Sequence, residues 1–264
     1  MSILRLSLAG TISAALALSA FGMNSGGAKR AAAEYSDKEE INQSFDLGQG
    51  AQVRINSING TVKVETWDQP KAEIHIVKST NEGPDELKRV DVIIDHSSGR
   101  LEIRTRHDDG DRSPQVNVRV EAKLPRQMDL NISGVNGATD VGPITGKFHA
   151  NGINGHLKIA ESTEELNLDG INGGITASLA TLGSNGIRAS GINGSIQIEI
   201  PEDTNATIDV TGQNGSFTSD LPITMVGEVM RNQTHAQIGS GGTPIRMDGI
   251  NGGIRLRKRT GRAM

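Results

Sequence analysis

From about Ile41 onward, apolar and polar residues alternate in short runs along the chain. Clear examples are Val62-Lys63-Val64, Glu73-Ile74-His75-Ile76-Val77 and Val116-Asn117-Val118-Arg119-Val120. Alternation of β-branched residues with a period of two predicts half-buried β-strands. One break in the pattern, residues 83–89, predicts either a single helical turn or a connection between strands.

A five-residue motif recurs through this alternating region. Each copy opens with a short polar residue and closes with Asn-Gly, and an apolar residue precedes the Asn in every copy except the one with Gln213. The copies are Asn56–Gly60, Ser133–Gly137, Asn151–Gly155, Asp169–Gly173, Ser190–Gly194, Thr211–Gly215 and Asp248–Gly252. From Asn136 to Asn214 the Asn residues follow at steps of 18, 18, 21 and 21, and the last step, to Asn251, is 37. The long step indicates either a coil that has lost its motif or an inserted loop.

The strands on either side of each motif predict a stacked architecture. Leu157-Lys158-Ile159 follows one Asn-Gly, and Leu166-Asn167-Leu168 precedes the next motif. One repeat then makes one coil, which buries too little apolar surface to fold alone, so coils must stack as parallel strands about 4.8 Å apart. The predicted fold class is all-β: a parallel β-solenoid or β-helix-like stack with Asn-Gly turns and a column of Asn side chains. Residues 34–130 are predicted either to continue this stack or to form a small sandwich.

The first 33 residues have the features of a secretory signal. Arg5 precedes the apolar stretch from Leu6 to Ala20, which is shorter than the ~20 residues that span a bilayer. An uncleaved N-terminal anchor is the alternative. The expected organisation is therefore a signal peptide (1–33), an N-terminal β region (34–130), a repeat β-solenoid (131–258) and a basic tail (259–264).

The positive charge near the C-terminus has two interpretations. Arg255 and Arg257 are expected on the outward face of the last strand, followed by the basic tail. They form either a charged cap over the open end of the stack or a contact with an anionic envelope polymer.

Composition excludes several classes of function. The 264 residues include no Cys, so disulfides, zinc–thiolate sites and cysteine nucleophiles are excluded. Six aromatic residues offer no stacking platform, which argues against a sugar binder of the aromatic-platform type and against a binder of single-stranded nucleic acid. A net charge of −4 provides no basic field, so nucleic acid is not an expected partner.

The candidates for catalysis are few. Asp169 and Asp248 occupy the same motif position but are predicted three or four coils apart, about 14–19 Å, and too distant for a glycosidase pair. His149 and His156 flank one turn as a conceivable surface metal pair, and the other His residues show no ligand spacing. Neither a nucleophile elbow nor a phosphate-binding loop is present. We therefore predict no catalytic, cofactor-binding or metal residues, and no cofactor.

Several stretches resemble a family of exported bacterial domains known as putative adhesins, over roughly residues 45–258. They are Gly60–Asp68 with its Trp-Asp ending, Val118–Pro125 with its final Pro, the Asn-Gly repeats, and Gly239–Ile254. The resemblance implies a β-solenoid-like fold and a location in the cell envelope, and the family offers no established catalytic residues. This chain departs from the family where an acidic residue follows Asn-Gly, since Ala138, His156 and Gly174 stand there, which weakens a cation-binding role.

Together these features predict an exported, non-catalytic cell-envelope protein. It would act as an adhesin, binding module or scaffold through its solenoid faces, with an envelope or surface component as its unidentified partner. Self-association through stacked coils is a further expectation, and no transmembrane segment is expected in the mature chain. The alternative is a polysaccharide lyase or hydrolase, since parallel β-helices host such enzymes.

Overall fold

The structure, a computed structural model, describes residues 2–5, 35–56, 58–107, 112–226 and 233–259, and of residues 2–5 only the backbone. It is all-β, as predicted, with two large mixed sheets and one short helix, α1 (Pro84–Leu87). Of the two alternatives for residues 83–89, a helical turn or a connection between strands, the structure shows the helical turn. Apart from Ser2–Arg5, the predicted signal peptide lies outside the described residues, as does the basic tail beyond residue 259.

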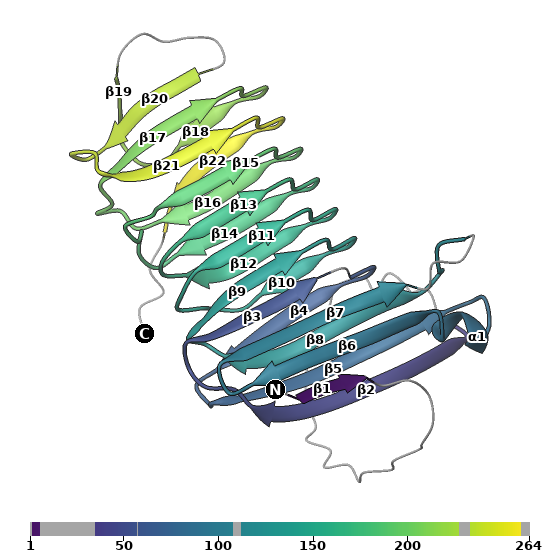
Figure 1. Cartoon of the computed structure of the whole chain (residues 1–264). Helices are drawn as coiled ribbons and strands as arrows, with labels where there is room; N and C mark the ends of the chain where they lie inside the picture. The colour runs from purple at the N-terminus through teal and green to yellow at the C-terminus, as the bar shows by residue number, and fades with distance from the viewer. Residues whose placement is uncertain (1, 6–34, 57, 108–111, 227–232, 260–264) are drawn as a thin grey trace, which may run out of the picture.

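The strands are divided between two sheets, which we name sheet I and sheet II (Figure 1). Sheet I contains, in spatial order, β1 (Ser2–Arg5), β6 (Val90–Ser97), β7 (Arg100–His107), β3 (Ala51–Asn56), β9 (Met128–Ser133), β11 (Phe148–Asn151), β13 (Leu166–Asp169), β15 (Ile187–Ser190), β21 (Thr243–Asp248), β17 (Ala206–Thr211), β20 (Gln233–Ile238) and β19 (Ile223–Met225). Sheet II contains β18 (Phe217–Ser219), β22 (Ile254–Lys258), β16 (Ile196–Ile200), β14 (Ile175–Leu179), β12 (Leu157–Ser162), β10 (Thr139–Val141), β4 (Val62–Trp67), β8 (Asn117–Pro125), β5 (Lys71–Thr80) and β2 (Asp37–Asp46).

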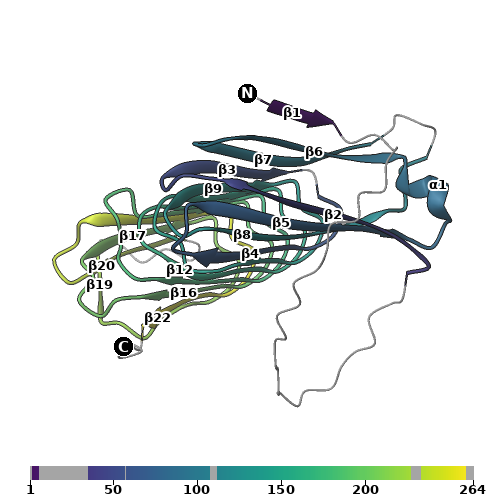
Figure 2. The ribbon, with the colours of Figure 1, turned by 90° about the horizontal axis from the view of Figure 1, so that it is seen from below.

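The chain passes from sheet I to sheet II at each five-residue motif, and the resulting strand pairs lie above one another as rungs (Figures 1 and 2). The rungs, in spatial order, are β3–β4, β9–β10, β11–β12, β13–β14, β15–β16, β21–β22 and β17–β18. Neighbouring rungs pair in parallel in both sheets, as predicted from the repeat. Antiparallel strands lie at both ends of the stack, for example β5 against β2 and β20 against β17.

The last repeat in the sequence is not the last rung in space. Strand β21 lies between β15 and β17, and β22 lies between β16 and β18. The 37-residue step from Asn214 to Asn251 contains β18 and the antiparallel pair β19–β20, which extends sheet I beyond β17. The step is therefore an insertion, and the chain returns from it to occupy an interior position.

This order corrects the interpretation of the C-terminal arginines. Arg255 and Arg257 face outward from β22, as expected, but β22 is an internal strand and does not cover an open edge. Arg255 pairs with Asp220 at 3.4 Å, and Arg257 lies 3.7 Å from Glu199. These charges are balanced by acids of the neighbouring segments.

The N-terminal β region joins the same two sheets. Strand β3 pairs in parallel with β9, and β4 pairs in parallel with β10, so the early motif at Asn59 forms the first rung. Buried apolar residues form one cluster between the sheets, which extends from Ile41 to Leu256. Lys78 links α1 to this region. Its buried ammonium group donates hydrogen bonds to the carbonyl oxygens of Leu87 and Val90 and pairs with Glu39 at 2.7 Å.

Candidate binding surfaces

The five-residue motif forms the corner that joins the two sheets. Gly170, its second residue in one copy, has a φ of 58°, in the left-handed region that favours glycine. The Gly that follows the Asn is needed for a different reason: a Cβ on Gly173 would lie 2.0 Å from the carbonyl oxygen of Gly155 in the adjacent rung. Stacked rungs therefore approach one another here more closely than a side chain allows.

The Asn side chains form one continuous file of hydrogen bonds. Nδ2 of Asn172 donates to Oδ1 of Asn154 at 3.0 Å, and Nδ2 of Asn193 donates to Oδ1 of Asn172 at 3.1 Å. Equivalent bonds join Asn136 to Asn59, Asn154 to Asn136, Asn251 to Asn193 and Asn214 to Asn251. The predicted column of Asn side chains is confirmed, and it includes every copy of the motif.

The position of an Asn in the file determines how much its replacement is expected to lower the free energy of unfolding. Replacing Asn172 by Ala removes one donated and one accepted side-chain bond, and we expect the free energy of unfolding to fall by about 1–2 kcal/mol. Asn214 ends the file and donates one such bond, so Asn214→Ala is expected to cost about half as much. Urea denaturation followed by far-UV circular dichroism measures both, and equal losses at the two positions would contradict the file.

Several of the polar residues that open the motifs are also hydrogen bonded to one another, beside the Asn file. Asp169 accepts hydrogen bonds from Asn151 Nδ2 at 3.0 Å and from Ser190 Oγ at 2.5 Å, and Asp248 accepts one from Thr211 Oγ1 at 2.6 Å. Because the last repeat is inserted, Asp169 and Asp248 are two rungs apart with Ser190 between them, and the predicted separation of three or four coils is wrong. Two rungs correspond to about 9.6 Å. Both carboxylates are engaged by neighbouring rungs and act as turn caps.

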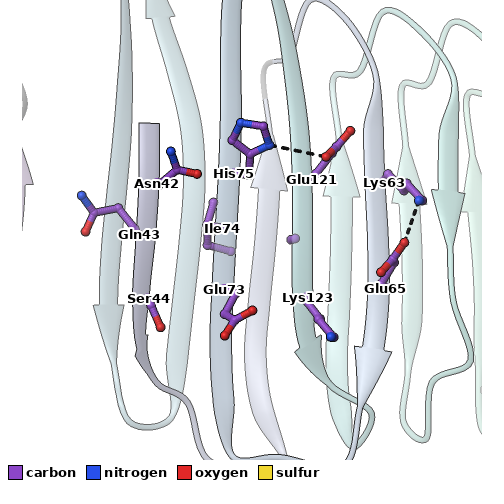
Figure 3. A pocket seen from close by; sticks show the side chains of 11 residues that line it. Asn42, Gln43, Ser44, Lys63, Glu65, Glu73, Ile74, His75, Glu121 and Lys123 are labelled. Atoms are coloured by element: carbon purple, nitrogen blue, oxygen red, sulfur yellow. Dashed lines mark hydrogen bonds and ion pairs between the residues drawn. The ribbon is translucent and has the colours of Figure 1, made fainter. Parts of the chain in front are cut away.

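A shallow depression of about 440 Å³ lies on the outer face of sheet II, where β2, β5, β8 and β4 are adjacent (Figure 3). Within β4, Lys63 Nζ lies 2.6 Å from Glu65 Oε1, and between β5 and β8, His75 Nδ1 lies 3.5 Å from Glu121 Oε2. Its lining residues are Asn42, Gln43, Ser44, Lys63, Glu65, Glu73, Ile74, His75, Glu121, Ala122 and Lys123.

Charges of opposite sign alternate across this outer face. In register, Glu121 of β8 faces Lys63 of β4, then Asp140 of β10, then Lys158 of β12. The hydrogen bond to Glu65 raises the pKa of Lys63, and the charges of Glu65, Glu121 and Asp140 add to this effect. The depression itself is lined by two Lys and three Glu side chains, so its charges largely compensate one another.

Where the pKa of a carboxyl group is shifted, it is lowered, which favours the charged form. A hydrogen bond from the backbone N–H of Gln115 lowers the pKa of Glu86, with further contributions from Arg89 and Arg112. The pKa of Glu102 is lowered by Arg100, and that of Asp85 by Lys88. A general acid requires the opposite displacement.

These lowered pKa values predict acid sensitivity. Because the folded chain binds protons less readily than the unfolded chain, stability present above about pH 4.5 should be lost as the pH falls further. Glu86→Gln removes part of this linkage, so its Tm should fall less between pH 7 and pH 3 than that of the parent chain. Glu164→Gln, at an exposed loop residue, is the matched control and should retain the parent slope. A Glu86→Gln profile parallel to that of the parent would contradict the assignment.

The structure places the two candidate metal histidines in different parts of the fold. His149 lies in β11 of sheet I, whereas His156 precedes β12 of sheet II, so the two residues belong to different sheets. In the part of the chain that the structure describes, no group of three or more His, Asp or Glu side chains is arranged to hold a metal ion. None of the helices in that part is both long and apolar enough to cross a membrane.

The sequence did not single out the depression on sheet II. Alternation places Glu73, His75, Glu121 and Lys123 on outward positions of their strands. Their proximity, however, depends on the strand order β4–β8–β5–β2, which periodicity does not specify.

No protein-family model matches the chain, and no curated protein matches it in sequence. Among solved structures, a putative cell adhesion protein from Clostridium sporogenes is 10% identical, with a TM-score of 0.44, covering 84% of this chain and 100% of that one. A putative adhesin from Parabacteroides merdae is 11% identical, with a TM-score of 0.31, covering 84% and 97%. A putative lipid binding protein from Parabacteroides distasonis is also 11% identical, with a TM-score of 0.29 and the same coverage. Similarities at this level assign no function to the chain.

Proposed function

We propose that this chain is an exported, non-catalytic binding module of the bacterial cell envelope, built as a parallel β-solenoid. The observation that carries the proposal is the register of the rungs. Equivalent residues of successive repeats lie side by side, so each outer face presents rows of polar side chains at the spacing of the strands, about 4.8 Å. Such rows suit a partner that is itself extended and periodic.

The contacts that neighbouring side chains make with the carboxylates support a binding role over catalysis. Asp169 and Asp248 are held by side chains of neighbouring rungs, and Glu121 and Glu65 are engaged by His75 and Lys63. A polysaccharide hydrolase or lyase, the alternative, requires a carboxyl group or base that is free to exchange a proton with the substrate. Export is part of the proposal and derives from residues 1–33 of the sequence.

The proposal is tested by measuring both the export of the chain and its binding to envelope fractions. The chain is expressed with residues 1–33 in place, and its amount outside the inner membrane is compared with that of a chain lacking residues 2–33. The exported protein is then incubated with envelope fractions, and both retention and shortening of the glycans are measured. We expect export of the full chain alone, and saturable retention without shortening. Glycan turnover that is abolished by replacing one carboxylate would instead establish the enzyme.

A further inference from the structure

Six side chains form a continuous row across the outer face of sheet I. They occupy equivalent register positions on six neighbouring parallel strands, and we name them the donor row: Arg54, Asn131, His149, Asn167, Arg188 and Arg246. The residues on either side of each are buried, so the row itself faces outward. Five strand spacings give it a length of about 24 Å.

Within the described residues, none of the six side chains of the donor row makes a hydrogen bond or an ion pair. The neighbouring turn caps differ, since Asp169 and Asp248 each accept bonds from adjacent rungs. The side chains of the donor row are therefore available to a ligand.

Two arginines in this row are direct neighbours, and within the described residues neither forms an ion pair. Arg188 of β15 lies opposite Arg246 of β21 in register, and both are exposed. Like charges directly opposite one another on adjacent strands destabilise a sheet. The pair therefore opposes folding stability, which is the expected cost of a site that receives an anion.

Acidic residues delimit the row at both ends. Glu102 faces Arg54 but is paired with Arg100 at 2.7 Å, and Asp209 faces Arg246 but is hydrogen bonded to His235. Between these two carboxylates the row contains no acidic side chain, whereas the corresponding row of sheet II alternates in sign from Glu121 to Lys158.

The chemistry of the row indicates its ligand. A guanidinium group binds a carboxylate through two parallel hydrogen bonds, and amide and imidazole groups bind hydroxyls. Arg188 and Arg246 line a depression of about 370 Å³ with Ser190, Thr211 and the engaged Asp209 and Asp248. We infer that the donor row binds a linear acidic polysaccharide, with its carboxylates on Arg188 and Arg246 and its hydroxyls on Asn131, His149 and Asn167. This inference rests on the proposed binding function and names its ligand class.

The test compares two double variants of equal charge change. Arg188→Gln with Arg246→Gln removes the two arginines of the donor row, and Arg255→Gln with Arg257→Gln removes two paired arginines from the other face of the rung that holds Arg246. Affinity is measured by calorimetry for polygalacturonate, with dextran sulfate and neutral dextran as comparison polymers. We expect the first variant to weaken polygalacturonate binding by about 10- to 100-fold with a Tm that is unchanged or higher. The second variant should bind as the parent does.

Each other outcome overturns the inference. Equal losses in both variants would show nonspecific attraction of a polyanion, and binding of dextran sulfate without polygalacturonate would assign a different anion. An absence of binding to either charged polymer, with retention on envelope fractions intact, would remove the donor row as a site and leave the proposed function standing. Loss of both retention and polymer binding would refute the two together.

Discussion

Replacing Gly173 by Ala is expected to lower the free energy of unfolding by about 3 kcal/mol, a large effect for the addition of one methyl group. The new Cβ would lie 2.0 Å from the carbonyl oxygen of Gly155, which is backbone and belongs to the adjacent rung. The strain cannot be relieved by rotating a side chain, so the corner must open and disturb the Asn file beside it. Chemical denaturation at neutral pH measures the loss.

The control for this prediction is Gly99→Ala. Gly99 lies between β6 and β7, and a Cβ placed there meets no atom within 4 Å. We expect a change below about 0.5 kcal/mol, because an exposed position with room for the methyl group loses no contact. If Gly173→Ala were as mild as this control, the close approach of stacked corners would not be what requires glycine after each Asn.

Turn chemistry made the repeat predictable. Gly170 and Gly173 are recognisable as corner residues from their spacing, and the Asn between them recurs at the same position in each copy. Because the same local geometry is stacked in register, each motif position is expected to lie beside the same position of another copy. The Asn file and the parallel rungs could therefore be predicted without a structure.

The order of the rungs could not be predicted in the same way. A period indicates that repeats stack, but it does not specify which repeat lies next to which, and β21–β22 occupies an interior place because an inserted hairpin lets the chain return. One signal was present in the sequence: Gln213 replaces the apolar residue of the motif. It belongs to the last rung in space, where Gln213 and Phe217 are only partly buried. A polar residue is least costly where the core ends.

The outward surfaces depend on this order. Arg188 and Arg246 become neighbours only because β21 is placed against β15, so the unpaired arginines have no signature along the chain. The acids that pair with Arg255 and Arg257 likewise come from other segments. Alternation identifies which residues face solvent, and the three-dimensional register decides which of them act together.

Ile171→Asp is the second substitution expected to have a large effect, and it tests the interior of the same rung. Ile171 is 1% exposed and belongs to the apolar cluster between the sheets, with Ile153 and Ile192 at the same motif position in adjacent rungs. A carboxylate placed there has no partner, and an uncompensated buried charge costs about 3–5 kcal/mol. Burial should raise the pKa of the new carboxyl group, so the cost should shrink as the pH falls towards 5 and the group becomes protonated.

The control is Thr176→Asp, which introduces the same residue on the outward face of β14, beside Lys158 in register, and should change stability by less than about 0.5 kcal/mol. Denaturation curves of both variants at pH 7 and pH 5 separate the two cases: a mild, pH-independent effect at position 171 would mean that this file of residues does not face the core.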